Sequence, residues 1–268
     1  MKQHLNSIHM RTIAVSIILG LAALAAVTGQ DPRDLIKKSH DAVKVKSFEA
    51  VATLTITDSR DNQRIRENTM ASMTIPDGTE KRIIKFLSPP EVKGTGILIF
   101  DYPEKSDDMW IYLPALRKTR RIVSTEKSKS FMGSEFSNAD MTAPGLDDFT
   151  YEMLGEGTVD GSSCYQIQST PASRDLEDVY GYARSVRWVN KNNYLVQKTE
   201  YYNFDGDLFK TIENKAFKEL DPENHKYMVT HMIAQNLSNG RSSEMVMEKV
   251  AVTATDPSYF TVSFLEKE

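Results

Sequence analysis

The sequence predicts a mainly β protein of the α+β type, in which one large antiparallel sheet follows a single N-terminal helix. Three observations support this. Apolar residues change from helical to alternate spacing near Ser47, turn sequences such as Pro76-Asp77-Gly78 separate the alternating runs, and no change of composition marks a linker. A flat sheet would expose an apolar face, so we expect a sheet of about eleven strands that curls around an apolar cavity. The pattern alone is equally compatible with a β-sandwich or a closed barrel.

Residues 1–29 have the organisation of a secretory signal peptide. Lys2 and Arg11 precede an uncharged, largely apolar run that ends at Gly29, and cleavage after Ala25 or Gly29 would satisfy the preference for small residues. The run is slightly shorter than the ~20 residues that a spanning helix needs, so an uncleaved anchor is the less favoured alternative. No cysteine lies near either cleavage point. We therefore expect export to the periplasm without lipidation, and residues 30–268 as one domain.

The charge argues against a nucleic-acid-binding protein, and the cysteine content excludes a disulfide-stabilised one. The formal net charge is -4, and an acidic surface does not attract nucleic acid. Cys164 is the only cysteine, so an intrachain disulfide cannot form. We expect Cys164 to be a small buried strand residue and not a nucleophile, and the protein to be a monomer.

One helix and many strands follow along the chain. Asp31-Pro32 supplies an N-cap and a proline at the first helical position, and the helical spacing continues to Lys44. A terminal segment after Asp256-Pro257 should anchor Phe260, Phe264 and Leu265. Between them, segments with strand character cover residues 48–56, 65–75, 81–87, 95–101, 109–113, 118–124, 149–154, 164–170, 182–190, 194–203, 208–220, 227–237 and 242–253.

The sequence contains no grouping typical of catalysis or of metal binding. His225 and His231 would lie ~20 Å apart along an extended strand, too far to share a metal. The pairs Asp107-Asp108 and Asp147-Asp148 fall in expected loops, and no nucleophile elbow, phosphate loop or dinucleotide fingerprint is present. We therefore expect no catalytic residue, metal or cofactor, and no enzymatic activity. A hydrolase with an unrecognised site is the remaining enzymatic alternative.

Apolar side chains provide the candidate binding site. Residues 109–113 are apolar at both strand parities, and methionines on the last two long strands suit a pocket that adapts to variable acyl chains. Residues 131–141 carry large apolar side chains without strand alternation, which fits a mobile flap over the cavity or a fixed loop packed on the core. An ordinary core role is the alternative for each residue. The candidate cavity residues are Trp110, Tyr112, Leu113, Phe131, Met132, Phe136, Met141, Trp188, Met232 and Met245.

A basic run follows the aromatic strand directly. Arg117, Lys118, Arg120 and Arg121 form a positive patch on an acidic protein, and this patch could contact anionic headgroups or an acidic partner. A solvated edge strand that its charges protect from aggregation fits the same residues equally well.

Several sequence blocks resemble the outer-membrane lipoprotein-sorting family, the LolA-like periplasmic carriers. They are WIYLPALRKTRRI, SFMGSEFSNADM, WVNKNNYLVQKTEYYNFDGDLFK and the terminal FTVSFL. The resemblance implies a half-barrel with a lid over an apolar interior. It further implies a carrier that binds the acyl chains of a lipoprotein or lipid and shuttles them between inner and outer membranes.

The resemblance leaves the cargo and the partners open. The chain is longer than the protein that gives the family its name and contains the additional SFMGSEFSNADM block. An inner-membrane exporter and an outer-membrane acceptor are the candidate partners. The alternative is an envelope sensor or adaptor with the same fold, acting with an inner-membrane exporter or regulator.

Overall fold

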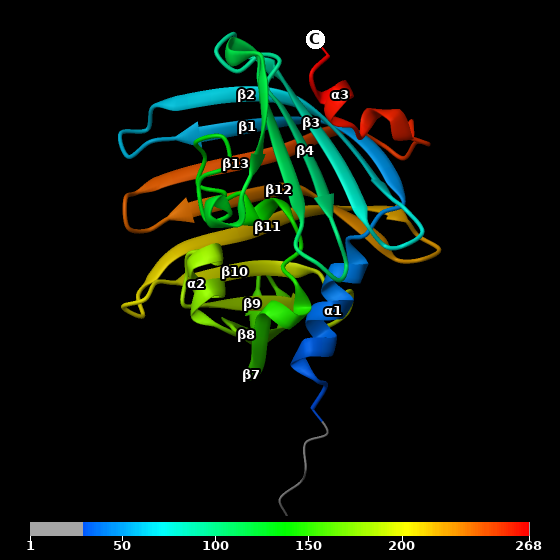
Figure 1. The fold of residues 1–268 in the computed structure, drawn as a ribbon. Coiled ribbons are helices and arrows are strands. Elements are labelled where there is room, and N and C mark those ends of the chain that lie inside the picture. The colour runs from blue at the N-terminus through cyan, green and yellow to red at the C-terminus, as the bar shows by residue number, and fades with distance from the viewer. Residues whose placement is uncertain (1–28, 268) are drawn as a thin grey trace, which may run out of the picture.

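The computed structural model describes residues 29–267 and contains one open antiparallel sheet (Figure 1). The expected signal peptide, except for its last residue, lies outside the described residues. The strands are β1 Ser47–Thr57, β2 Gln63–Thr74, β3 Glu80–Ser88, β4 Gly96–Asp101, β5 Asp108–Leu113, β6 Lys118–Ile122, β7 Phe149–Val159, β8 Ser162–Pro171, β9 Arg184–Asn190, β10 Val196–Tyr202, β11 Leu208–Asp221, β12 Lys226–Asn236 and β13 Arg241–Ala251. The predicted mainly β, half-barrel class is confirmed. The sheet has thirteen strands instead of about eleven, because every segment with strand character joins it.

Two meanders make up this sheet. The order is β6-β5-β4-β3-β2-β1-β13-β12-β11-β10-β9-β8-β7. Strands that are consecutive in sequence therefore lie side by side, except for β6 and β7, and the two meanders meet where β1 pairs with β13. There Ala52 lies opposite Met247 and Leu54 opposite Met245. The open edges are β6 and β7, and the chain between them, residues 123–148, connects one edge to the other.

Three short helices accompany the sheet: α1 Pro32–Ala42, α2 Arg174–Tyr180 and α3 Val262–Leu265. The predicted cap of α1 is present, because the Asp31 side chain accepts a hydrogen bond from Arg33 N at 2.9 Å and Pro32 begins the helix. The helix ends at Ala42, two residues before the predicted end. Helix α2 was not predicted from the sequence; Ser173 caps its N-terminus, and it ends before Gly181, which has the left-handed conformation.

Single 3-10 turns occur in the connecting segments and near the C-terminus: η1 Pro114–Leu116, η2 Ser124–Glu126, η3 Ala139–Met141, η4 Leu146–Asp148 and η5 Pro257–Tyr259. Three of the five, η2, η3 and η4, fall between β6 and β7. The connection between the two sheet edges is thus built from tight turns.

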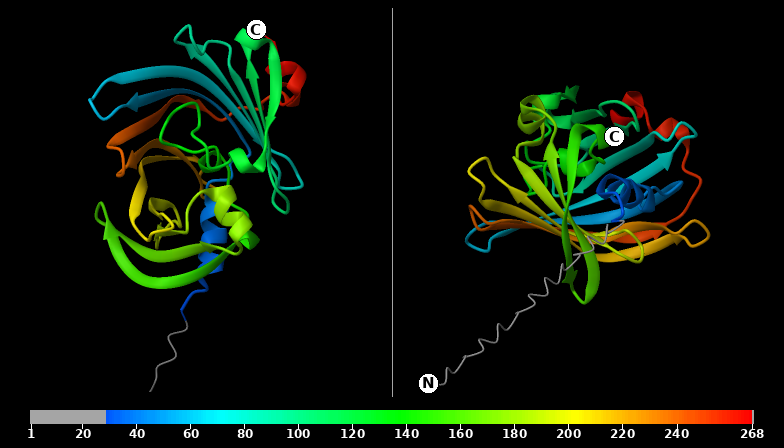
Figure 2. Two further views of the ribbon diagram at one scale, coloured as in Figure 1. Left: turned by 60° about the vertical axis from the view of Figure 1, so that its left-hand side comes forward. Right: turned by 90° about the horizontal axis from the view of Figure 1, so that it is seen from below.

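The sheet is strongly curved, and its inner face holds the main core (Figure 2). Helix α1 packs Leu35 and Ile36 against Ile167 of β8 and Val189 of β9, all with no exposed surface. Phe48, Leu54, Ile84 and other alternate side chains of β1 to β5 and of β12 and β13 form a second inner cluster with the 123–148 segment. The curled sheet is therefore filled from inside by a helix and by a long connection.

The outer face of β2 to β5 is covered by the C-terminal segment. Leu265 of α3 and the nearby Phe260 pack on Leu98 of β4 and Tyr112 of β5. Gly96 allows this close approach, because a Cβ atom there would lie 2.6 Å from Leu265 Cδ1. The predicted anchoring of Phe260, Phe264 and Leu265 is confirmed. Cys164 is fully buried in β8, as predicted. Within residues 29–267, every helix is too short or too polar for a membrane crossing.

Candidate functional site

The inner face of the sheet contains a cavity of about 310 Å³. This volume is near the lower end of the ~300–1,000 Å³ typical of small-molecule sites. Its apolar wall consists largely of flexible side chains from β1, β2, β11, β12, β13 and the 123–148 segment, namely Phe48, Met70, Phe136, Met141, Ile212, Met228, Met232, Met245 and Met247. Met232 and Met245 are direct cross-strand neighbours. Unbranched, polarizable methionines allow such a wall to adapt its shape.

The cavity wall also contains charged groups, most of which are paired. Arg82 of β3 forms an ion pair with Glu80 and donates to the Met141 carbonyl at 2.7 Å. Lys210 Nζ of β11 lies 2.7 Å from Asp140 Oδ2. These contacts hold residues 140 and 141 against strands from both halves of the sheet.

Two groups in the wall have strongly shifted pKa values. Burial raises the pKa of Asp101 to about 6, against the opposing effect of a hydrogen bond from Ala143 N at 2.8 Å. Burial, followed by repulsion from Arg187 and Lys44, lowers the pKa of His40 to about 3. At neutral pH, Asp101 is therefore mostly ionised and His40 is neutral.

The 123–148 segment is packed into the inner face. Phe131 and Phe136, each 1% exposed, lie at the two ends of a tight turn in which Phe131 N donates to the Phe136 carbonyl at 2.7 Å. Met132 and Gly133 have positive φ angles of 52° and 74°, which the turn requires.

Glu135 fastens this turn to the two C-terminal strands. Its backbone N–H donates to Ser243 Oγ at 3.0 Å, and its carboxylate accepts from Asn236 Nδ2 at 2.9 Å. Arg241 Nε lies 2.7 Å from Glu135 Oε1. In this structure, residues 131–141 are therefore a loop packed on the core, which is the second of the two arrangements expected from the sequence.

The structure brings four of the ten candidate cavity residues to the cavity wall: Phe136, Met141, Met232 and Met245. Phe131 and Met132 belong to the same inner cluster but do not line the cavity. Leu113 is half-buried at the end of β5 and also lies away from it.

The expected cavity positions of Trp110, Tyr112 and Trp188 need correction. Trp110 and Tyr112 face outward, where Trp110 packs edge-on against Phe100 at 5.3 Å between ring centroids. Trp188 lies on the outer face of β9, over Gly157. The strand 109–113 is apolar on both faces because the C-terminal segment covers its outer side, so alternation could not distinguish the two faces.

Sequence reasoning missed the charged and phenolic part of the cavity wall, which includes His40, Asp140, Arg187 and Tyr201. One signal was present in the sequence. Arg187 interrupts the apolar strand Val186–Val189 at the parity of Val189, which faces α1. A charge at an inward position of a strand indicates a buried polar site.

The basic run occupies the edge strand β6 and the residue before it. Arg120 Nη1 lies 2.8 Å from Glu126 Oε2, and Arg121 is paired with Asp108. In the described part of the chain, Arg117 and Lys118 have no ion-pair partner. The charged-edge interpretation of these residues therefore fits their location, and their contact with headgroups or a partner stays a prediction.

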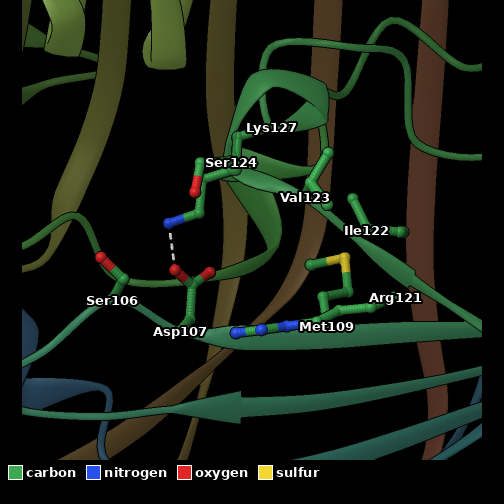
Figure 3. A pocket seen from close by; sticks show the side chains of 8 residues that line it. All are labelled: Ser106, Asp107, Met109, Arg121, Ile122, Val123, Ser124 and Lys127. Carbon is green, nitrogen blue, oxygen red and sulfur yellow. Dashed lines mark hydrogen bonds and ion pairs between the residues drawn. The ribbon is translucent and has the colours of Figure 1, made fainter.

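A second, smaller pocket of about 110 Å³ lies beside this edge (Figure 3). Lys127 is directed at the Asp107 carboxylate, with Met109 and Arg121 nearby. This pocket has no apolar wall comparable to that of the main cavity, so the main cavity is the candidate functional site.

The architecture defines a LolA-like half-barrel, and comparison with solved structures agrees. A putative outer membrane lipoprotein-sorting protein domain from Vibrio parahaemolyticus has a TM-score of 0.79 at 23% identity, covering 88% of this chain and 98% of its own. A LolA superfamily protein from Nitrosomonas europaea has a TM-score of 0.66 at 18% identity, covering 88% and 100%. At these identities the likeness shows the fold, and the LolA-like fold predicted from the sequence is confirmed.

The chain belongs to a family of uncharacterized proteins whose sequence profile matches residues 78–267. A DUF1329 family protein from Desulfovibrio piger is similar in both fold and sequence, with a TM-score of 0.78 and 28% identity over 88% of this chain and all of that one. None of the curated proteins matches the chain.

Proposed function

We propose that the protein is a periplasmic carrier that binds the acyl chain of a lipid or lipoprotein in the methionine-lined cavity and moves it between the inner and outer membranes. The observation that carries the proposal is the cavity itself, which is bounded by the curved sheet, by α1 and by residues 139–144. Each methylene transferred from water to such a site contributes about 0.8 kcal/mol. Binding and release are sufficient for this function, and no catalytic residue is needed.

The expected signal peptide supports the periplasmic part of the proposal. Residues 1–29 carry the charged and apolar regions of an export signal. The fold shared with a lipoprotein-sorting domain and with a LolA superfamily protein supports the carrier part.

Mass spectrometry of the bound material tests the proposal. The full chain is expressed in a bacterium, purified from the periplasm without detergent and extracted with organic solvent. We expect acylated molecules in an amount that approaches the amount of protein. A reproducibly empty protein would refute the carrier function.

A pair of substitutions assigns the bound lipid to the cavity. Met232→Trp places a bulky ring in the cavity wall and should reduce the recovered lipid several-fold. Met73→Trp changes a half-buried methionine in the outer-face cluster and should leave the amount unchanged. An equal loss in both variants would locate the lipid elsewhere.

The second candidate function is that of a sensor or adaptor. It is favoured by the exposed cations Arg117 and Lys118 at the open edge strand β6, because an edge strand can pair with a strand of a partner. Crosslinking in cells from position 118 separates the two functions. Capture of a membrane regulator, together with absence of lipid from the purified protein, would support the adaptor.

A further inference from the structure

Arg187 of β9 is a buried cation without an anionic partner among the residues that the structure describes. Its residue is 7% exposed and lines the cavity. Among the described residues, its one side-chain hydrogen bond goes from Nη1 to Ser169 Oγ at 2.6 Å, and no carboxylate is in ion-pair contact with it. A guanidinium has five N–H donors, so most of its donor capacity remains unused.

The neighbouring groups carry no compensating charge. Arg187 lies 5.9 Å from the centre of the Phe149 ring. It is flanked across the strands by Ile167 and Thr199. His40 is neutral because burial and the charge of Arg187 lower its pKa to about 3.

Two of the nearby phenols, Tyr151 and Tyr201, are also neutral and already donate their protons elsewhere. Tyr151 donates to the Leu146 carbonyl at 3.1 Å, and Tyr201 donates to Asp140 Oδ1 at 3.1 Å. Burial raises the pKa of both phenols above the usual value. None of these groups can neutralise the guanidinium.

The nearby carboxylates are occupied by other donors. Asp140 accepts from Lys210 Nζ at 2.7 Å and from the Ser137 backbone N–H at 2.7 Å. Asp148 accepts from the Tyr180 hydroxyl at 2.6 Å. Among the described residues, the cavity wall therefore presents a buried cation without a carboxylate partner, held in place by Ser169 and an aromatic ring, beside a large apolar surface.

We infer that Arg187 binds the anionic head of the carried molecule, so that the cavity selects an amphiphile with one acyl chain and a terminal carboxylate or phosphate. This inference rests on the proposed carrier function and adds the chemical class of the ligand. A guanidinium fork matches both anions in bidentate geometry. A cavity of about 310 Å³ favours a single chain over the several chains of a lipoprotein anchor. The anionic head enters the cavity together with its acyl chain, so the exposed basic run at the β6 edge is not needed to bind it.

Calorimetric titration with three 12-carbon probes tests the inference. The purified full chain is titrated with dodecanoate and dodecyl phosphate, each below its micelle-forming concentration, and with the uncharged dodecanol below its solubility limit. We expect one or both anions to bind at least about tenfold more tightly than dodecanol, because hydrogen bonds to a charged partner contribute this much. The anion that binds more tightly identifies the head group as a carboxylate or a phosphate.

Three variants of the same strand assign this selectivity to Arg187. Arg187→Gln should lose the preference for the anions and retain the affinity for dodecanol. Arg187→Lys should keep part of the preference for the anions. Arg184→Gln is the matched control, since Arg184 lies at the opposite strand parity and stacks on Tyr202 at 3.5 Å. Its selectivity should equal that of the unmodified protein.

The outcomes separate the inference from the proposed function. Binding of dodecanol and the anions with equal affinity would overturn the role of Arg187 and leave the carrier function intact. Binding of none of the probes would contradict the carrier function itself. Since the selectivity is measured first on the unmodified protein, the test does not depend on the stability of any variant.

Discussion

The ion pair between Lys210 and Asp140 should be the most sensitive electrostatic contact of the cavity wall. Both side chains are 10% exposed, and Lys210 Nζ lies 2.7 Å from Asp140 Oδ2. Burial acts to raise the pKa of Asp140, but attraction to Lys210 and hydrogen bonds from Lys210 and Ser137 outweigh it, so the pKa is lowered. The stability of this site therefore depends on the cation.

Lys210→Met removes the charge and keeps a side chain of comparable length. It leaves an uncompensated carboxylate in the wall, and breaking a buried pair in this way typically costs about 3–5 kcal/mol. Asp140 keeps its hydrogen bonds from Ser137 and Tyr201, which favours the lower half of that range. We expect a loss of about 3 kcal/mol in the free energy of unfolding at pH 7.

Urea unfolding followed by tryptophan fluorescence measures this loss. Lys215→Met on the same strand is the matched control, because Lys215 pairs with the 70% exposed Asp160 and with Glu213 near the surface. An exposed pair contributes about 0–1 kcal/mol, so the control should lose no more than that. Adding Asp140→Asn to Lys210→Met should restore most of the stability, since the unpaired charge is gone.

The pH dependence provides a further check of the same reasoning. In Lys210→Met, the pKa of Asp140 should rise above its unfolded value, so the variant should regain stability as the pH falls. The reasoning would be refuted if Lys210→Met lost less than about 1 kcal/mol, or no more than Lys215→Met.

Two other predictions concern the wall and the outer face. Because the folded pKa of His40 is lowered and that of Asp101 is raised, acidification from pH 7 to pH 5 destabilises the fold through His40 and stabilises it through Asp101. Between pH 7 and pH 5, the free energy of unfolding of His40→Gln should fall by about 2 kcal/mol less than that of the unmodified protein. That of Asp101→Asn should fall by about 1 kcal/mol more. If urea unfolding shows the same fall for both variants and the unmodified protein, these pKa shifts are contradicted. Gly96→Ala should cost about 1–3 kcal/mol, because its methyl group would overlap Leu265. Combining it with Leu265→Ala should give less than the sum of the two single losses, and strict additivity would exclude this contact as the cause.

The strands could be predicted from the sequence because alternation and turn residues act locally. Every segment with strand character, from 48–56 to 242–253, became a strand of the sheet. The capped helix α1 follows from Asp31-Pro32 in the same way. Helix α2 was missed because its seven residues form only two turns, too few for a periodic signal.

The cavity wall was only partly predictable because burial depends on which segments cover each face. From the methionines on β12 and β13 and from the aromatic loop, four residues could be predicted that line the cavity: Phe136, Met141, Met232 and Met245. Trp110 and Tyr112 face outward since α3 covers that side, and no local pattern shows where a C-terminal helix docks. The sequence shows the charge of Arg187 but not which carboxylates are already engaged by Lys210 and Tyr180.

The contact between β1 and β13 has a consequence for how the protein matures. Within the sheet, the two meanders are hydrogen-bonded to each other only where β1 pairs with β13, and there Ala52 lies opposite Met247, from the other end of the domain sequence. Non-local pairings of this kind form slowly, because the ends of a long chain must meet first. The N-terminal meander therefore retains an unsatisfied edge at β1 until the last strand has emerged from the ribosome. A chain that is secreted before it folds would postpone the pairing of β1 with β13 until both of its ends are in the same compartment.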